Sequence, residues 1–199
     1  MPGRLAAYGH SWVAGTGASS DDRCCVHVAA SLLEMTPVNL GVSGSSSAET
    51  AALVCRQGAV AADAYLLIVG LNDARLHGTN PVGIDAYAGA LRSILNQCAA
   101  ARPHAPVLLV EQPPLVRYDR HPPHDRGSPT ALDAYNDVLR QVAAQQSRTV
   151  VVIVAGWDAP SMLAEDTVHP NDLGHQTIGV AVAHAYSLAS IGTTSPAQD

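Results

Sequence analysis

The chain has 199 residues, of which 47% are hydrophobic and 14% charged, so it can bury one substantial core and is not intrinsically disordered. Its 11 basic residues are all arginines, and 17 acidic residues leave a formal net charge of -6. This charge repels a phosphate backbone, so we predict no nucleic-acid partner. No apolar run approaches the roughly 18 residues of a membrane span. The amino terminus lacks a secretory apolar stretch, and we expect a cytoplasmic protein.

Short β-rich runs alternate with longer segments of helical period. In chain order, we predict a strand over residues 5–8, a helix over 24–35, a strand over 38–40, a helix over 48–57, a strand over 65–69, a helix over 84–98, a strand over 107–111, a helix over 131–146, a strand over 150–154 and a helix over 172–188. This alternation predicts an α/β fold with a parallel sheet between two helical layers. We expect a single domain over residues 1–191 and a flexible tail over 192–199.

Two stretches of the chain show neither a strand pattern nor a helical period. Residues 112–128 are rich in Pro, Arg and His, and residues 155–168 carry one tryptophan and several acids. Both follow predicted strands, and open α/β sheets gather their ligand-binding loops at the carboxyl ends of the strands. We therefore expect these loops to border the functional site.

Four short polar segments also lie beyond predicted strands, over residues 9–12, 39–44, 70–73 and 166–170. Because the carboxyl ends of parallel strands share one edge of the sheet, we expect these segments to meet there. A serine attacks a carbonyl group only if a base takes its proton and hydrogen-bond donors receive the oxyanion. The four segments contain residues of all three kinds.

Ser11, His169 and Asp166 are the candidate nucleophile, base and orienting acid. Ser11 follows the first strand in a turn with Gly9, and Pro170 holds His169 on a loop by disfavouring helix at the residue before it. Asp166 lies three residues before His169, so the loop can fold its carboxylate onto one ring nitrogen, as a catalytic triad requires. Taken singly, Ser11 also fits a turn or capping residue, and His169 fits a surface histidine.

Gly41 and Asn72 are the candidate oxyanion donors. A glycine permits close approach of a substrate to its backbone amide, and Asn72 offers a side-chain amide. Each residue also fits a plain turn former.

The segments Gly-His-Ser-Trp, Asn-x-Gly-x-Ser-Gly, Gly-x-Asn-Asp and Asp-x-x-His-Pro, in this order, resemble the SGNH hydrolases, a branch of the GDSL-type esterases and lipases. The resemblance covers the chain from near Gly9 to about His175. It implies a flavodoxin-like three-layer α/β/α sandwich with a five-stranded parallel sheet. It also implies a triad of Ser11, Asp166 and His169, with an oxyanion hole formed by the amides of Ser11 and Gly41 and the side chain of Asn72.

One position departs from the family pattern. Where the family name has Gly-Asp-Ser, this chain has Gly9-His10-Ser11. We expect His10 to brace the turn in place of the aspartate; alternatively it stands near Ser11 and alters the pKa of the site. His10 is also a candidate for substrate contact. The sequence contains no Gly-x-Ser-x-Gly elbow, so an ordinary α/β-hydrolase is a poor fit.

Further side chains are candidates for substrate contact. Asp73 and Arg75 follow Asn72 closely, and they either line the pocket or pair with each other. Trp157 fits the wall of an acyl pocket and a packed core tryptophan equally well.

The 112–128 loop carries Arg117, Tyr118, Arg120 and Arg126. Guanidinium groups bind carboxylates and phosphates through two parallel hydrogen bonds. These side chains therefore either bind an anionic or sugar-like part of a substrate or pair with the loop's own aspartates. His121 and His124 are possible metal ligands, but two intervening prolines preclude a regular helix that presents both rings, and we predict no metal.

The resemblance implies a serine esterase that hydrolyses a carboxylic ester, with a short acyl or O-acetyl group, through an acyl-enzyme on Ser11. This chemistry requires no cofactor, and the expected partner is a small-molecule acyl ester. An acyltransferase would use the same triad, because pocket shape rather than the triad chooses the acceptor. A catalytically silent module that binds an acylated or glycosylated partner is a further alternative. The sequence does not specify an oligomeric state.

Overall fold

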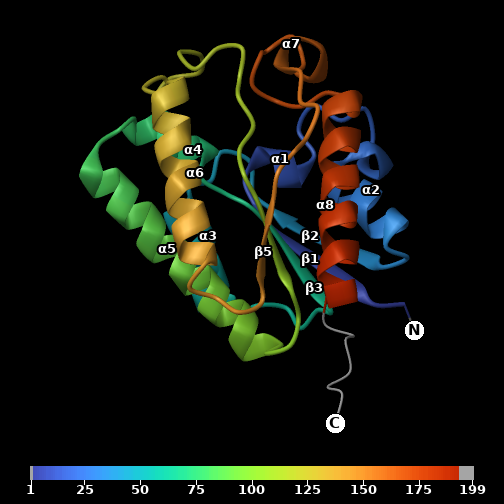
Figure 1. Cartoon of the computed structure of the whole chain (residues 1–199). Helices are drawn as coiled ribbons and strands as arrows, with labels where there is room; N and C mark the ends of the chain where they lie inside the picture. Colours follow the sequence, from blue (N-terminus) through green and yellow to red (C-terminus); the bar gives the residue numbers. More distant parts are fainter. Residues whose placement is uncertain (1, 193–199) are drawn as a thin grey trace.

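Five parallel strands form one sheet at the centre of the computed structural model, which describes residues 2–192 (Figure 1). The strands are β1 (Arg4–Gly9), β2 (Thr36–Gly41), β3 (Ala64–Ile68), β4 (Val107–Val110) and β5 (Thr149–Val152). Their order across the sheet is β2-β1-β3-β4-β5, and every adjacent pair is parallel. This is the strand order of flavodoxin-like folds, so the predicted fold class is confirmed.

Helices cover both faces of the sheet. They are α1 (Ser11–Ala14), the 3-10 helix η1 (Asp21–Arg23), α2 (Cys25–Leu32), α3 (Ser47–Gln57), α4 (Leu71–His77), α5 (Pro81–Ala101), α6 (Pro129–Ala143), α7 (Ala159–Met162) and α8 (Asp172–Gly192). Helices α2 and α8 pack together on one side, while α5 lies between α3 and α6 on the other (Figure 1). The result is a three-layer α/β/α sandwich.

The central strands are apolar because both faces of a parallel sheet are covered. All five residues of β3 and all four of β4 are buried. They belong to one hydrophobic cluster that also includes the apolar stripes of the long helices. Within residues 2–192, no helix is long and apolar enough to cross a membrane.

The predicted strands and long helices are all present, with ends displaced by a few residues. The helices α1, α4 and α7 are additional, because segments of four to seven residues are too short to show a helical period. Gly192, predicted as the first residue of the tail, ends α8, and residues 193–199 lie outside the described residues.

The carboxyl edge of the sheet positions the polar segments. Gly9 at the end of β1 is in register with Gly41 of β2 and with Ile68 of β3. At Gly9 the backbone φ is +150°, and a Cβ atom would lie 2.1 Å from the carbonyl oxygen of Ile68. Only glycine fits this close approach. The register of the strands starts the loops after β1, β2 and β3 at the same edge of the sheet.

Candidate active site

Ser11, His169 and Asp166 form one hydrogen-bonded chain. Ser11 Oγ lies 3.0 Å from Nε2 of His169, and Nδ1 of the same ring lies 2.5 Å from Oδ2 of Asp166. When the Nδ1 proton faces the carboxylate, Nε2 is left to accept the hydroxyl proton of Ser11. The arrangement can therefore activate the Ser11 hydroxyl as a nucleophile.

The loop from Asp166 to His169 folds around the carboxylate. Asp166 Oδ1 accepts hydrogen bonds from the amides of Val168 and His169, each at 2.9 Å. Thr167 adopts a φ of 65°, a left-handed conformation that turns the chain between them. Partial burial raises the pKa of Asp166, but hydrogen bonds from the His169 amide, the His169 ring and the Val168 amide outweigh it, so the pKa is lowered. The carboxylate is thus ionised at neutral pH.

Ser11 is the first residue of α1, and only 6% of it is exposed. Its neighbour Trp12 connects it to the histidine loop, because the indole Nε1 donates to the Val168 carbonyl at 3.1 Å. The two segments of the site, which are more than a hundred residues apart in the chain, are therefore joined by two contacts, one at Ser11 and one at Trp12.

His10 is buried and caps α1. Its ring is 1% exposed, and its Nδ1 accepts the amide of Trp12 at 3.4 Å. Burial lowers the pKa of His10 to about 3. The structure thus agrees with the bracing role of this ring in the turn.

Gly41 is placed differently from its predicted role. Its amide already donates to Oδ1 of Asn39 at 3.0 Å, and a Cβ atom there would lie 2.3 Å from the amide nitrogen of Ala14. The glycine allows β2 to pack closely against α1, and its amide is not free to receive an oxyanion. The expectation for Gly41 is therefore corrected.

The next glycine of the same loop is more suitably placed. Gly44 is exposed with a φ of +80°, and among the described residues its amide has no acceptor. The loop is fixed beside the site because Val42 donates to the Gly9 carbonyl at 2.9 Å. Asn72, at the start of α4, donates from Nδ2 to the Ser45 carbonyl at 2.9 Å, and its second amide hydrogen remains.

The side chains of Asp73 and Arg75 are buried, and each bonds to another segment of the fold. Asp73 is 4% exposed and accepts the amide and hydroxyl of Ser47 at the start of α3. Burial raises its pKa, although the bonds from Ser47 oppose the shift. Arg75 is 3% exposed and donates to the carbonyl of Arg120, so it holds the 112–128 loop.

The candidate residues of the 112–128 loop form contacts within that loop. Arg117 is exposed and forms a two-bond ion pair with Asp119, as the alternative of internal pairing predicts. Tyr118 is half-buried, and its hydroxyl accepts the amide of Leu115 at 3.1 Å. His121 and His124 form a turn and belong to no cluster of possible metal ligands among residues 2–192.

One candidate ligand cluster, Cys24, Cys25 and His175, was not anticipated. Both nitrogens of the His175 ring are already engaged: Nδ1 accepts the Cys25 amide at 3.3 Å, and Nε2 lies 3.1 Å from the Thr16 carbonyl. The cluster is buried and packs α2 against α8. It is a structural feature of the core.

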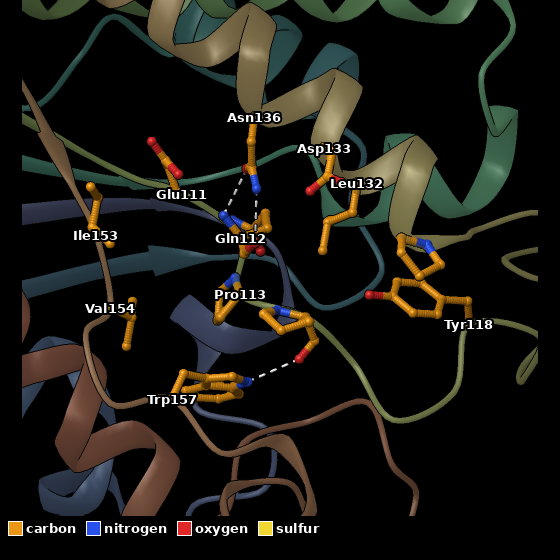
Figure 2. Close-up of a pocket in the computed structure, with 12 residues that line it drawn as sticks. Glu111, Gln112, Pro113, Tyr118, Leu132, Asp133, Asn136, Ile153, Val154 and Trp157 are labelled. Atoms are coloured by element: carbon orange, nitrogen blue, oxygen red, sulfur yellow. Dashed lines mark hydrogen bonds between the residues drawn. The ribbon is translucent and has the colours of Figure 1, made fainter.

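A pocket of about 250 Å³ lies near the carboxyl end of β4, and Ser11, Asp166 and His169 are not among the residues that line it (Figure 2). It is bounded by the chain after β4, by α6 and by Trp157, whose Nε1 donates to the Pro114 carbonyl at 2.9 Å. The residues on either side of Ser11 reach its lining: His10 contacts Gln112, and Trp12 stacks on Trp157 with ring centroids 5.7 Å apart. Tyr118 lines the pocket as well, whereas Arg117 does not.

The model of the GDSL-like lipase/acylhydrolase family matches residues 7–177. A comparison with curated protein sequences finds no significant match.

Solved structures share the fold at low sequence identity. The salicylyl-acyltransferase SsfX3 from a tetracycline biosynthetic pathway has a TM-score of 0.74 and 18% identity over 98% of this chain, which spans 56% of that protein. The psychrotrophic esterase EstA from Pseudoalteromonas sp., in a form inhibited by monoethylphosphonate, has a TM-score of 0.67 and 17% identity over 94% of this chain and 97% of its own. An acetyl esterase variant with bound acetate has a TM-score of 0.69 and 19% identity over 96% of this chain and 100% of its own.

Proposed function

Because the chain belongs to the GDSL-like lipase/acylhydrolase family, we propose that it is a serine esterase that cleaves a carboxylic ester through an acyl-enzyme on Ser11. The observation that carries the proposal is the continuous chain of hydrogen bonds from Ser11 through His169 to Asp166. A silent binding module has no need of this alignment.

In the first half of the reaction, Ser11 Oγ attacks the carbonyl carbon while His169 Nε2 takes the hydroxyl proton. The ionised Asp166 stabilises the imidazolium that forms. The tetrahedral intermediate then expels the alcohol, which receives the proton from His169. In the second half, water is deprotonated by His169 and attacks the acyl group, and Ser11 is regenerated.

Three donors support the oxyanion in this proposal. They are the amide of Ser11, the amide of Gly44 and the remaining side-chain hydrogen of Asn72. The segments that carry them start at the same edge of the sheet, after β1, β2 and β3. Donors fixed in this way stabilise the charge that develops in the transition state.

In this proposal, the pocket that Gln112 and Trp157 line receives the acyl group. A volume of about 250 Å³, narrowed by Trp157 and by prolines after β4, favours a short acyl group over a long lipid chain. The net charge of -6 disfavours an anionic ester, and Arg117 is paired with Asp119.

Transfer to an alcohol or amine is the second candidate, because the SsfX3 structure that shares this fold is described as an acyltransferase. The two reactions have the same acyl-enzyme and differ in what attacks it. Product analysis with an activated ester, in the presence and absence of small alcohols, separates them: free acid alone indicates hydrolysis, and a new ester indicates transfer.

The proposal is tested by the intact mass of the protein after treatment with a fluorophosphonate, followed by peptide mapping. We expect one adduct, on Ser11, and none in Ser11→Ala. A folded wild-type protein that takes up no phosphonate would contradict the proposal, and an adduct on another serine would relocate the nucleophile.

A further inference from the structure

His10 occupies the position at which the family name has an acid, immediately before Ser11. A carboxylate can accept a backbone amide with either oxygen, whereas a neutral imidazole accepts with only one nitrogen. His10 caps α1 through Nδ1, which lies 3.4 Å from the Trp12 amide. The cap therefore exists only in the tautomer that carries its proton on Nε2.

The side chain of Gln112 faces the other nitrogen of the ring. Gln112 Oε1 lies 3.3 Å from His10 Nε2, and both residues are almost fully buried. The amide nitrogen of Gln112 donates to the carbonyls of Val69 and Val110, at 3.3 and 3.4 Å. These bonds fix which end of the amide points at the ring. Because an amide oxygen only accepts, the hydrogen must reside on His10 Nε2.

The backbone of Gln112 is held just as firmly. Its amide donates to Asn136 Oδ1 at 2.9 Å, and its carbonyl accepts from Asn136 Nδ2 at 3.0 Å (Figure 2). Asn136 thus anchors the backbone of Gln112 to α6, which fixes the position from which the carboxamide reaches His10.

We propose that Gln112 is a positioning residue that selects the Nε2-protonated tautomer of His10 and thereby fixes the start of α1, which carries Ser11. The kinetic part of this inference rests on the proposed function, whereas the tautomer itself does not. Burial keeps the ring of His10 neutral by lowering its pKa to about 3. The hydrogen bond to Gln112 raises this pKa, and the nearby charges of His169 and Arg75 lower it further.

The tautomer is measured first, on the wild-type protein. Long-range proton–nitrogen correlation spectra of the nitrogen-15-labelled chain distinguish the two neutral forms and the charged ring, and His10→Asn assigns the signal by its loss. We expect a neutral His10 with the proton on Nε2 from about pH 5 to 8. A proton on Nδ1, or a charged ring in this range, overturns the inference, whatever the enzyme does.

Gln112→Met then removes the acceptor while keeping the length of the side chain. We expect a mixed tautomer and a rate of phosphonate labelling lower by about tenfold, on the scale of one lost hydrogen bond. Val142→Ala, a buried change in α6, is the control for lost stability and should leave the tautomer and the labelling rate unchanged. Unaltered tautomer and rate in Gln112→Met contradict the inference.

The same substitution is repeated in a His10→Asp background, where the cap needs no particular tautomer. There we expect Gln112→Met to change the labelling rate by less than about twofold, so that the two substitutions are coupled. An equal loss in both backgrounds means that Gln112 acts only by packing. If the wild-type tautomer is as expected and no variant reacts with the phosphonate, the proposed function fails and the tautomer assignment stands.

Discussion

Asp166 and His169 make two hydrogen bonds, one from the backbone amide and one from the ring of the histidine, and each uses a different oxygen of the carboxylate. The Val168 amide donates a third hydrogen bond to Asp166. The Asp166 carboxylate therefore fixes the path of the loop and the direction of the imidazole together. A change that preserves the loop but alters the partner of Nδ1 separates these two roles.

Asp166→Asn is such a change. The amide oxygen can still accept the backbone amides, but a side-chain NH₂ facing Nδ1 forces the His169 proton onto Nε2, where it can no longer take a proton from Ser11. We expect turnover of an activated ester to fall by about 10⁴-fold, the loss found when a triad histidine has the wrong tautomer. Steady-state kinetics and calorimetric melting check this.

Glu165→Gln is the matched control, because Glu165 is the exposed residue next to Asp166. It should keep turnover within about twofold. A rate for Asp166→Asn within tenfold of wild type is incompatible with an orienting role for this carboxylate.

Asn72→Ala tests the oxyanion donor. Loss of one such donor costs about 100- to 1000-fold in turnover, so we expect a fall of this size. Because Ser11 and His169 are untouched, labelling by the phosphonate should remain detectable. Since Asn72 also holds the Ser45 carbonyl, the melting temperature is measured in parallel; an unchanged rate removes Asn72 from the oxyanion hole.

Gly41→Ala and Gly44→Ala should differ in stability. A methyl group on Gly41 meets the backbone of Ala14, which cannot yield, so we expect the melting temperature to drop by many degrees. At Gly44 there is open space, and only the positive φ is unfavourable, by about 1–2 kcal/mol. Equal melting temperatures for the two variants would show that β2 does not pack against α1 as closely as described.

His10 predicts a pH dependence of stability. Its pKa in the folded protein is about 3, below the ordinary value of 6.5, so the unfolded chain binds the proton more readily between these values. Folding stability therefore falls as the pH is lowered through this window. We expect the melting temperature of wild type, relative to that of His10→Asn, to decrease from pH 7 to pH 4. The opposite slope contradicts a neutral, buried ring.

Trp157→Ala should enlarge the pocket and change the preferred acyl group. The indole bounds the pocket and bonds to Pro114, so its removal opens space beside Ser11. We expect kcat/KM for octanoyl esters to rise relative to acetyl esters by at least tenfold. Measured over an acyl series, an unchanged order of preference would place the acyl group elsewhere.

The sequence predicts the sheet and the triad because their signals are local. Apolar runs mark strands such as β3, and the Asp-x-x-His-Pro spacing places Asp166 beside His169 within one loop. The sequence does not distinguish Gly41 from Gly44 as the proposed oxyanion donor, because both are glycines of the same loop. The bond from the Gly41 amide to Asn39, and the packing of Gly41 against Ala14, become visible only in the structure.

Gln112 and Asp73 show a second limit of prediction from the sequence. Gln112 contacts His10 across 102 residues, and Asp73 contacts Ser47 across 26, so no spacing rule relates either pair. Asp73 follows Asn72 directly and reads as a site residue, yet the first turn of α4 directs it to the start of α3. Side-chain direction in a short helix depends on the tertiary structure around it.

The two tryptophans of the chain, Trp12 and Trp157, stack on each other next to Ser11, at an interplanar angle of 24°. All of the indole emission of this protein therefore originates near Ser11, the proposed nucleophile. Acylation of Ser11, or a ligand in the adjacent pocket, changes the environment of one or both rings. The intrinsic fluorescence of the unlabelled chain is thus a direct optical reporter of events at this one place in the molecule.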